Sequence, residues 1–196
     1  MVNNDMTERA FPPEQVGEML IKVDRFGRED GTVDKRKAHE KGVLHRAISV
    51  CIFDAKGRWL LQKRSPKKYH SAGLLANACC GHPRPNEDTP AAAQRRVHEE
   101  LGISCPLHFC SSFVYKTKVT DGLTEYEFDH LYVGFYNEDV HPDPKEVESI
   151  LFLEEKEIET QLKNSPHLFA AWFPFVFREV MLHKNNLLKA APGKII

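Results

Sequence analysis

The sequence has no long hydrophobic run and no excess of charge of either sign. The longest nearly apolar stretch runs from Leu168 to Phe177 and contains Pro174. It is far shorter than the roughly 20 residues that a membrane-spanning helix needs. Lysine and arginine total 27 and aspartate and glutamate total 28, so the net charge is −1, and no bulk charge attracts a nucleic acid. We therefore expect neither a membrane nor a nucleic acid as partner.

A paired set of cysteines and a targeting segment are also missing. The five cysteines, two of them adjacent at Cys79 and Cys80, do not form a disulfide framework. The N-terminal residues contain no apolar segment like that of a signal peptide, and their many acidic side chains are not typical of a transit peptide. These absences predict a reducing, cytoplasmic environment.

The composition is that of a globular protein. Apolar residues make up 41% of the 196 residues and charged residues 28%, which are ordinary values for a folded domain. The length predicts one domain. We expect residues 1–16, which include Pro12 and Pro13, to form a loose lead-in, and residues 17–196 to form the domain.

Several segments alternate between apolar and polar residues, as β-strands do. Arg46 to Phe53 alternates in this way, with Ile48, Val50 and Ile52 on one face. Residues 54–57 are a turn signal, which predicts a hairpin with a return strand at 57–63. Further extended segments are predicted at 18–23, 32–37, 112–119, 124–136 and 147–153.

Helices are predicted between these strands. Residues 89–101 form one, with Thr89 as its cap, Pro90 at its first position and Gly102 at its end. A polar helix is predicted at 154–163, and a last helix from near Leu168, with a kink at Pro174. Hairpins interspersed with helices predict a mixed sheet covered by helices.

The helix at 89–101 carries charges at regular spacing. Arg95 shares a helix face with Glu99, and Arg96 shares one with Glu100. A loop and helix that present carboxylates on one face suit a Mg²⁺ ion bound to a diphosphate. A solvated helix with ion pairs along its surface explains the same spacing equally well.

Three histidines and two glutamates form a second set of candidates. Glu125 and Glu127 point to the same side of a predicted strand, about 6.6 Å apart, and His39, His45 and His82 lie elsewhere in the chain. Together they could surround one ion, and mixed nitrogen and oxygen ligands suit Mn²⁺, Mg²⁺, Zn²⁺ or Fe²⁺. The remaining histidines are interpreted as surface or hydrogen-bonded residues: His70, His98, His108, His130, His141, His167 and His183.

Cys80 has neighbours that the other cysteines lack. Gly81 follows it directly, and His82 comes next. If His82 binds a metal, the Cys80 thiol lies at the rim of that site, where it could transfer a proton or attack a substrate. The other cysteines are interpreted as small core or neutral surface residues.

The segment from Gly81 to Ile103, GHPRPNEDTPAAAQRRVHEELGI, resembles the Nudix box. In that motif a glycine, a glutamate, an Arg-Glu pair and a Glu-Glu pair recur at these intervals. Arg96 departs from the pattern, because the family has there a glutamate that belongs to its metal-binding set. A permanent cation removes an expected ligand and supplies a charge that binds a diphosphate instead. The departure disfavours a pyrophosphohydrolase.

A wider set of motifs follows one order along the chain. These are Ala38-His39, Leu44-His45-Arg46-Ala47, Lys63-Arg64-Ser65, Asn77, Cys80-Gly81-His82-Pro83, the modified Nudix box, Glu125-x-Glu127 and Trp172. Together they resemble the type I isopentenyl-diphosphate isomerases of the Nudix superfamily over residues 17–180. The resemblance implies an α/β (α+β) fold, with a Nudix-like mixed β-sheet sandwiched between helices. It also implies the interconversion of isopentenyl and dimethylallyl diphosphates in isoprenoid biosynthesis.

This reaction adds a proton at one end of a double bond and removes another from the far side, through a carbocation-like state. The resemblance implies that Cys80 and Glu127 do this work on opposite faces of the substrate. Tyr115 would hydrogen-bond near Glu127 and aid protonation. Trp172 would face the cationic carbon, where the indole ring stabilises positive charge. An ordinary strand aromatic and a core tryptophan are the plainer interpretations of these last two residues.

The resemblance also implies two binding sites for ions. The metal site would consist of His39, His45, His82, Glu125 and Glu127, and would hold Mn²⁺, Mg²⁺ or Zn²⁺. The diphosphate would be bound by Lys35, Arg64, Lys68 and Arg96. Glu100 would hold a further Mg²⁺ that the diphosphate also binds. The expected partner is thus a small allylic or homoallylic diphosphate, and we expect a monomer or weak dimer.

Two other functions stay open. A Nudix pyrophosphohydrolase acting on a nucleoside diphosphate derivative fits the box, but Arg96 opposes it and it leaves Cys80 and Glu127 without a role. A non-catalytic Nudix-like binding module would have no need for three histidines together with Glu125 and Glu127.

Overall fold

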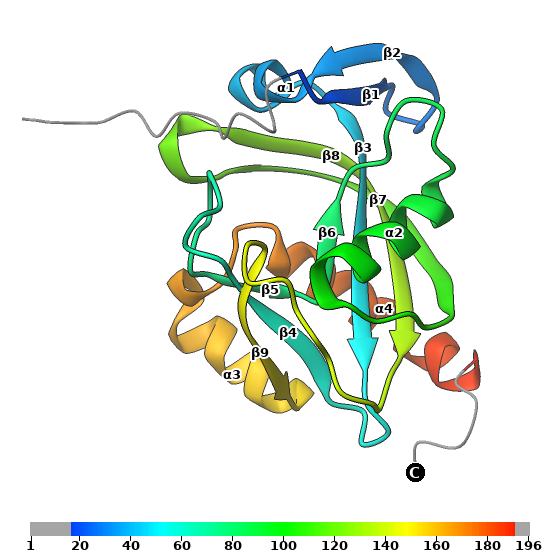
Figure 1. Cartoon of the computed structure of the whole chain (residues 1–196), viewed down its shortest axis with the longest axis vertical. Helices are drawn as coiled ribbons and strands as arrows, with labels where there is room; N and C mark the ends of the chain where they lie inside the picture. Colours follow the sequence, from blue (N-terminus) through cyan, green and yellow to red (C-terminus); the bar gives the residue numbers. More distant parts are fainter. Residues whose placement is uncertain (1–16, 191–196) are drawn as a thin grey trace, which may run out of the picture.

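A mixed β-sheet runs through the centre of the protein (Figure 1). The computed structural model describes residues 17–190, and within them the side chains of all residues except 121 and 184–190. The strands are β1 (Met19–Val23), β2 (Glu29–Asp34), β3 (His45–Phe53), β4 (Trp59–Arg64), β5 (Leu75–Asn77), β6 (Cys79–Gly81), β7 (Leu107–Lys118), β8 (Thr124–Phe135) and β9 (Val147–Leu153). The helices are α1 (Lys35–Lys41), α2 (Thr89–Leu101), α3 (Glu155–Asn164) and α4 (Phe173–Ala190). The lead-in expected at residues 1–16 lies outside the described residues.

Strand β3 is the centre of the sheet. It pairs in parallel with β8 along its whole length, from His45 opposite Glu127 to Phe53 opposite Phe135. It also pairs antiparallel with β6, with β4 and, at its first residue, with β1. Strands β7 and β8 form a long antiparallel hairpin, and β4 is flanked by β5 and β9. The parallel pair brings together segments that are far apart in the sequence.

Each face of the sheet is covered by helices. On one face, Ile48, Val50 and Ile52 of β3 pack in one core with Val97 and Leu101 of α2, as the alternation of these residues predicts. On the other face, the core contains residues of β3, β8, α3 and α4: Cys51, Leu131, Val133, Ile158, Phe173 and Val176. The predicted fold, a mixed sheet sandwiched between helices, is confirmed.

Helix α2 has the predicted bounds but a different cap. The side chain of Asp88, not that of Thr89, accepts a hydrogen bond from the Ala91 amide, so Pro90 follows one position later in the first turn, where its missing N–H costs nothing. Gly102 ends the helix in the left-handed conformation, at φ 66°. A Cβ on this glycine would lie 2.5 Å from the His141 carbonyl oxygen, so a side chain has no room here.

Three predicted elements differ from the structure. The segment 32–37 is not extended throughout, because Asp34 accepts a hydrogen bond from the Lys37 amide and starts α1. Strand β7 begins at Leu107, before the predicted residue 112. The last helix begins at Phe173, after a 3₁₀ turn at Pro166–Leu168. Pro174 therefore lies in the first turn of α4, where proline needs no kink. No helix within residues 17–190 is long and apolar enough to cross a membrane.

Candidate active site

A row of polar side chains crosses three neighbouring strands near the N-terminal ends of β3 and β8. Tyr115 of β7 and His45 of β3 both lie opposite Glu127 of β8 in the sheet register. The Tyr115 hydroxyl donates a hydrogen bond to Glu127 Oε2 at 2.5 Å, and His45 Nε2 lies 3.5 Å from Glu127 Oε1. Facing positions on one side of a sheet bring side chains into contact, so the strand pairing itself builds this row.

Five side chains near this row form a cluster that could hold a metal ion. Each offers one ligand atom, and these atoms all lie within 4.8 Å of one another. The cluster consists of His39 from α1, His45 from β3, His82 after β6, and Glu125 and Glu127 from β8. The structure therefore brings together the five residues that the sequence analysis grouped from distant positions.

The backbone orients two of these histidines toward the centre of the cluster. His39 Nδ1 lies 2.7 Å from the Lys35 carbonyl oxygen, and His45 Nδ1 lies 2.8 Å from that of Val43. A carbonyl only accepts hydrogen bonds, so each Nδ1 carries the proton and each neutral ring has its lone pair on Nε2, which in His45 lies 3.2 Å from His82 Nε2. Partners of this kind fix the tautomer and ring orientation of metal-binding histidines.

The cluster contains the unsatisfied acceptors that a cation would satisfy. His39 Nε2 and Glu125 Oε2 are buried without a hydrogen bond, although they face each other at 3.2 Å. Burial acts to lower the pKa of His39, but Glu125, the Lys35 carbonyl and Glu127 together raise it above its usual value. Burial, together with the nearby His45, holds the pKa of His82 well below its usual value, so His82 keeps the neutral form that binds metals. Three imidazole nitrogens and two carboxylates fit a divalent ion.

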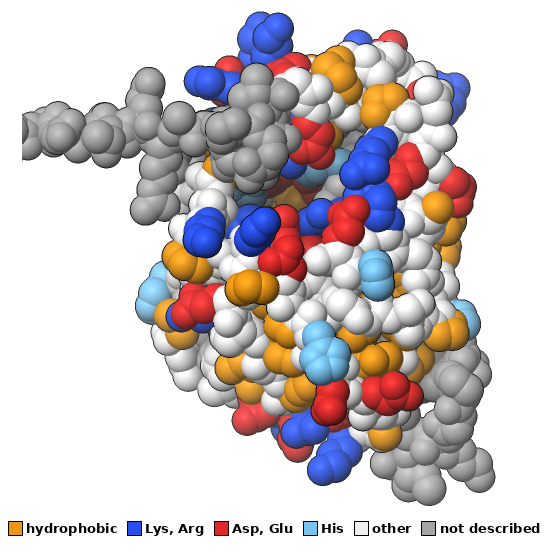
Figure 2. Space-filling model, in the orientation of Figure 1, with side chains coloured by type: hydrophobic (Ala, Val, Ile, Leu, Met, Phe, Trp, Pro, Cys, Tyr) orange, Lys and Arg blue, Asp and Glu red, His pale blue; other side chains and the backbone are white. Residues whose placement is uncertain are grey.

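The cluster borders a cavity of about 320 Å³. Figure 2 shows a hollow in this face of the molecule, rimmed by basic and acidic side chains. His82, Glu125 and Glu127 line the cavity, whereas His39 and His45 are fully buried and do not. A ligand in the cavity would therefore contact one side of the cluster only.

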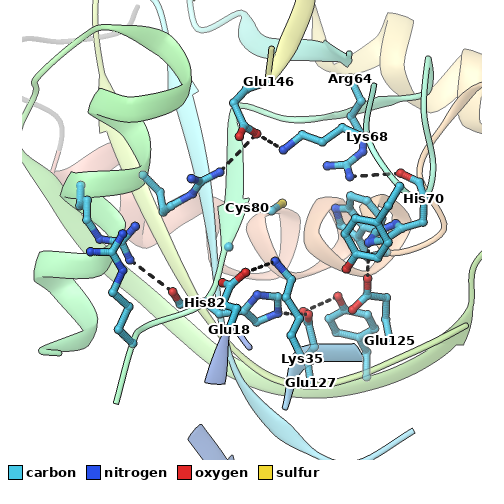
Figure 3. Close-up of a pocket in the computed structure, with 17 residues that line it drawn as sticks. Glu18, Lys35, Arg64, Lys68, His70, Cys80, His82, Glu125, Glu127 and Glu146 are labelled. Atoms are coloured by element: carbon cyan, nitrogen blue, oxygen red, sulfur yellow. Dashed lines mark hydrogen bonds and ion pairs between the residues drawn. The ribbon is translucent and has the colours of Figure 1, made fainter. Parts of the chain in front are cut away.

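Cys80, which is labelled in Figure 3, and Trp172 also line this cavity, and the side-chain amide of Asn77 holds both of them. The Cys80 thiol donates to Asn77 Oδ1 at 3.1 Å, and Trp172 Nε1 donates to the same oxygen at 3.3 Å. Burial raises the pKa of Cys80 to about 12, so the thiol keeps its proton at neutral pH. Burial and the adjacent Glu127 raise the pKa of Tyr115 well above its usual value, so the phenol stays a donor.

Six basic side chains line the rest of the cavity, Arg84 and Arg95 among them, and the other four are the predicted diphosphate ligands: Lys35, Arg64, Lys68 and Arg96. Lys35 Nζ lies 2.8 Å from Glu18 Oε2. The Arg64 guanidinium lies over the Trp172 ring, 5.0 Å from its centroid. Burial lowers the pKa of Lys68 to about 8. This group of cations is suited to bind an anion with several charges.

Comparisons with known proteins place the chain in a family. A NUDIX domain model matches residues 43–176. The chain is 44% identical over 163 residues to an isopentenyl-diphosphate Delta-isomerase of Serratia proteamaculans, covering 83% of this chain and 91% of that protein. It is 42% identical over 181 residues to isopentenyl-diphosphate Delta-isomerase 2 of Aromatoleum aromaticum, covering 91% and 95% of the two chains. The chain belongs to the isopentenyl-diphosphate Delta-isomerase family.

Solved structures of more distant proteins share the fold of this isomerase family member. DR0079 from Deinococcus radiodurans aligns with a TM-score of 0.68 and 17% identity, covering 82% of this chain and 98% of that one. A MutT protein from Methanosarcina mazei aligns with a TM-score of 0.59 and 20% identity, covering 72% and 95%. At these identities the likeness concerns the fold, and it supports the Nudix-like arrangement of sheet and helices.

Glu100 lies apart from the five-residue cluster of this isomerase family member. It is buried, does not line the cavity, forms an ion pair with Arg96 and accepts a hydrogen bond from Gln62 Nε2 at 2.9 Å. Arg95 and Glu99 form the ion pair that their spacing predicts, at 3.1 Å. The helix of the modified Nudix box therefore has both ion pairs that the spacing predicts. The Arg95–Glu99 pair lies at the surface, whereas the Arg96–Glu100 pair has a buried carboxylate and lies beside the cavity.

The sequence analysis missed several residues that surround the predicted ones. His70 was interpreted as an ordinary histidine, yet it is buried, lines the cavity and places Nε2 3.2 Å from Glu125 Oε1. Glu18 and Glu146, which pair with Lys35 and Lys68, also line the cavity. No motif marks these residues, because each acts on a partner that only the tertiary fold brings near.

Proposed function

We propose that the protein interconverts isopentenyl diphosphate and dimethylallyl diphosphate. The observation that carries the proposal is that Cys80 lines one cavity with Glu127 and its hydrogen-bonded Tyr115. The relatives named as isopentenyl-diphosphate Delta-isomerases cover most of the chain. A binding module would have no use for a protonated thiol and a buried carboxylate that face the same space.

The double bond moves when one carbon gains a proton and another loses one. Cys80 and Glu127 are the pair that exchanges these protons, one giving and the other taking, with the substrate between them. Tyr115 donates to Glu127 and so holds the carboxylate in one orientation. Asn77 does the same for the Cys80 thiol. These hydrogen bonds therefore fix the positions of the carboxylate and of the thiol sulfur in the cavity.

The cationic state between the two proton transfers needs stabilisation without a nucleophile. Trp172 presents an aromatic ring to the cavity, and a desolvated indole stabilises a cation by about 2 kcal/mol. Its hydrogen bond to Asn77 fixes the ring plane. The buried rings of Trp172 and Tyr115 in the cavity wall limit the water that would otherwise trap the cation.

The five-residue cluster is suited to a resident divalent ion, which we propose to be Mn²⁺, Mg²⁺ or Zn²⁺. When bound, such an ion supplies a fixed positive charge that orients the Glu127 carboxylate and changes its proton affinity. Lys35, Arg64, Lys68 and Arg96 bind the diphosphate of the substrate. Glu100 pairs with Arg96 in this structure, so we propose that it would reach a Mg²⁺ ion accompanying this diphosphate only once Arg96 turns from its carboxylate to the diphosphate.

The test is an incubation with isopentenyl diphosphate, Mg²⁺ and Mn²⁺ in D₂O. We expect dimethylallyl diphosphate that carries deuterium, measured by NMR and mass spectrometry, and no release of phosphate. Monophosphate products from a panel of nucleoside diphosphate derivatives, with no allylic product, would show a pyrophosphohydrolase instead and overturn the proposal.

A further inference from the structure

Three of the proposed diphosphate ligands, Lys35, Lys68 and Arg96, are already paired with carboxylates, and one of these carboxylates bridges two of them. Glu146 forms an ion pair with Lys68, and its Oε2 lies 3.5 Å from Arg96 Nη2 (Figure 3). Lys35 pairs with Glu18. The Glu146 carboxylate thus lies between two of the side chains that, under the proposed function, bind the diphosphate.

Glu146 differs from Glu100, which also pairs with Arg96, as does Glu99 at 2.8 Å on the surface of α2. Glu100 has 2% of its side chain exposed and a second hydrogen bond to Gln62, so it is part of the core. Glu146 has 28% of its side chain exposed and lines the cavity. It comes just before β9 and belongs to neither hydrophobic core cluster.

The backbone of Glu146 is held independently of its carboxylate. The Ser65 amide donates to the Glu146 carbonyl oxygen at 3.0 Å, and the Lys68 amide donates to the Ser65 carbonyl oxygen at 3.1 Å. Ser65 Oγ also donates to the Pro144 carbonyl oxygen at 3.2 Å. The two segments that carry Glu146 and Lys68 therefore stay joined when the side-chain ion pair opens.

We propose that Glu146 is a resident anion of the diphosphate site, which occupies Lys68 and Arg96 in the free enzyme and is displaced when a diphosphate binds. This inference rests on the proposed function and adds a residue that sets substrate affinity. The exchange replaces one carboxylate with a group of higher charge, so the cations are never left as an unpaired cluster of like charges. Glu146 is a positioning residue, since it acts through Lys68 and Arg96 and not on the reacting carbons.

The test measures the binding of inorganic pyrophosphate by calorimetry, in EDTA at fixed ionic strength. Removal of the competing charge in Glu146→Gln is expected to tighten binding about five- to tenfold. The matched control is Glu148→Gln, because Glu148 pairs with Lys63 at 2.9 Å and does not line the cavity; we expect it to stay within about twofold of the wild type. The KM for isopentenyl diphosphate should fall in Glu146→Gln without a rise in kcat.

A gain in affinity is a readout that simple loss of structure would not produce. Unchanged or weaker pyrophosphate binding in Glu146→Gln, with normal binding by the wild type, would overturn this inference and leave the proposed function intact. Binding by Glu146→Gln that weakens only when Mg²⁺ is present would also overturn it, because the carboxylate would then be a metal ligand. If the wild type itself binds no pyrophosphate, the proposed diphosphate site is wrong.

Discussion

The same face of β3 and β8 is a polar cluster at one end and a hydrophobic core at the other. His45 opposes Glu127 at the first end, and Cys51 opposes Val133 further along. Both pairs follow the same two-residue alternation, so the pattern determines the face of each side chain and not the environment it meets. The polar end buries carboxylates and imidazoles that cost free energy without a cation. The apolar end, packed under α4, supplies stability that the polar end does not.

The largest effect is expected when the proposed reacting groups are removed from the polar end. We expect Cys80→Ala and Glu127→Gln each to lower turnover about 1,000-fold, because each removes one partner of a proton transfer. The matched control is Cys79→Ala, since Cys79 is fully buried in the core on the α2 side of the sheet. Isomerase assays measure the turnover of each variant, and urea unfolding measures its stability. Turnover near the wild-type level in Cys80→Ala would show that the thiol has no part in proton transfer.

Filling the polar end with a metal ion should remove part of its cost. We expect Mn²⁺ added to EDTA-treated protein to stabilise the fold by about 2.7 kcal/mol at a free concentration 100 times the dissociation constant. The reason is that the buried acceptors of His39 and Glu125 gain a partner. Thermal melts against Mn²⁺ concentration measure the shift, and Glu125→Gln should reduce it. A melting temperature independent of Mn²⁺, Mg²⁺ and Zn²⁺ would contradict the metal assignment.

A truncation at the apolar end should lower stability and leave turnover near the wild-type level. Val133→Ala is expected to lower the free energy of unfolding by about 2 kcal/mol, since the side chain is 1% exposed in the core under α4. Val114→Ala in β7, where the side chain is 42% exposed, should change stability by less than about 0.5 kcal/mol. Urea unfolding measures both, and kcat should stay near the wild-type level. A large fall in kcat in Val133→Ala would show that the two ends are coupled.

The parts of the fold that sequence predicts are those with a local signal. The alternation in residues 46–53 predicts β3 and the face that packs on α2, and the cap, proline and glycine signals predict α2 from Thr89 to Leu101. Helix α1 and strand β6 were missed because elements of seven and three residues are too short to show a period. The parallel pairing of β3 with β8 has no local signal at all.

The candidate site also has parts that the sequence predicts and parts that it does not. Chemistry and motif order predicted the five residues of the metal cluster, although their spacing in the sequence alone could not place them together. The partners that hold the site, such as Asn77 between Cys80 and Trp172, follow from tertiary geometry. The sequence contains these residues but not the contacts that give them a role.

The parallel pairing of β3 with β8 also bears on when the protein becomes competent during synthesis. His45 and Glu127 meet only after the whole intervening chain has left the ribosome and closed a long loop, and closures of this kind are slow steps in folding. The nascent chain therefore carries His39, His45 and the Cys80 thiol before the cavity that they belong to has formed. The proposed metal site therefore forms late, as a property of the finished sheet.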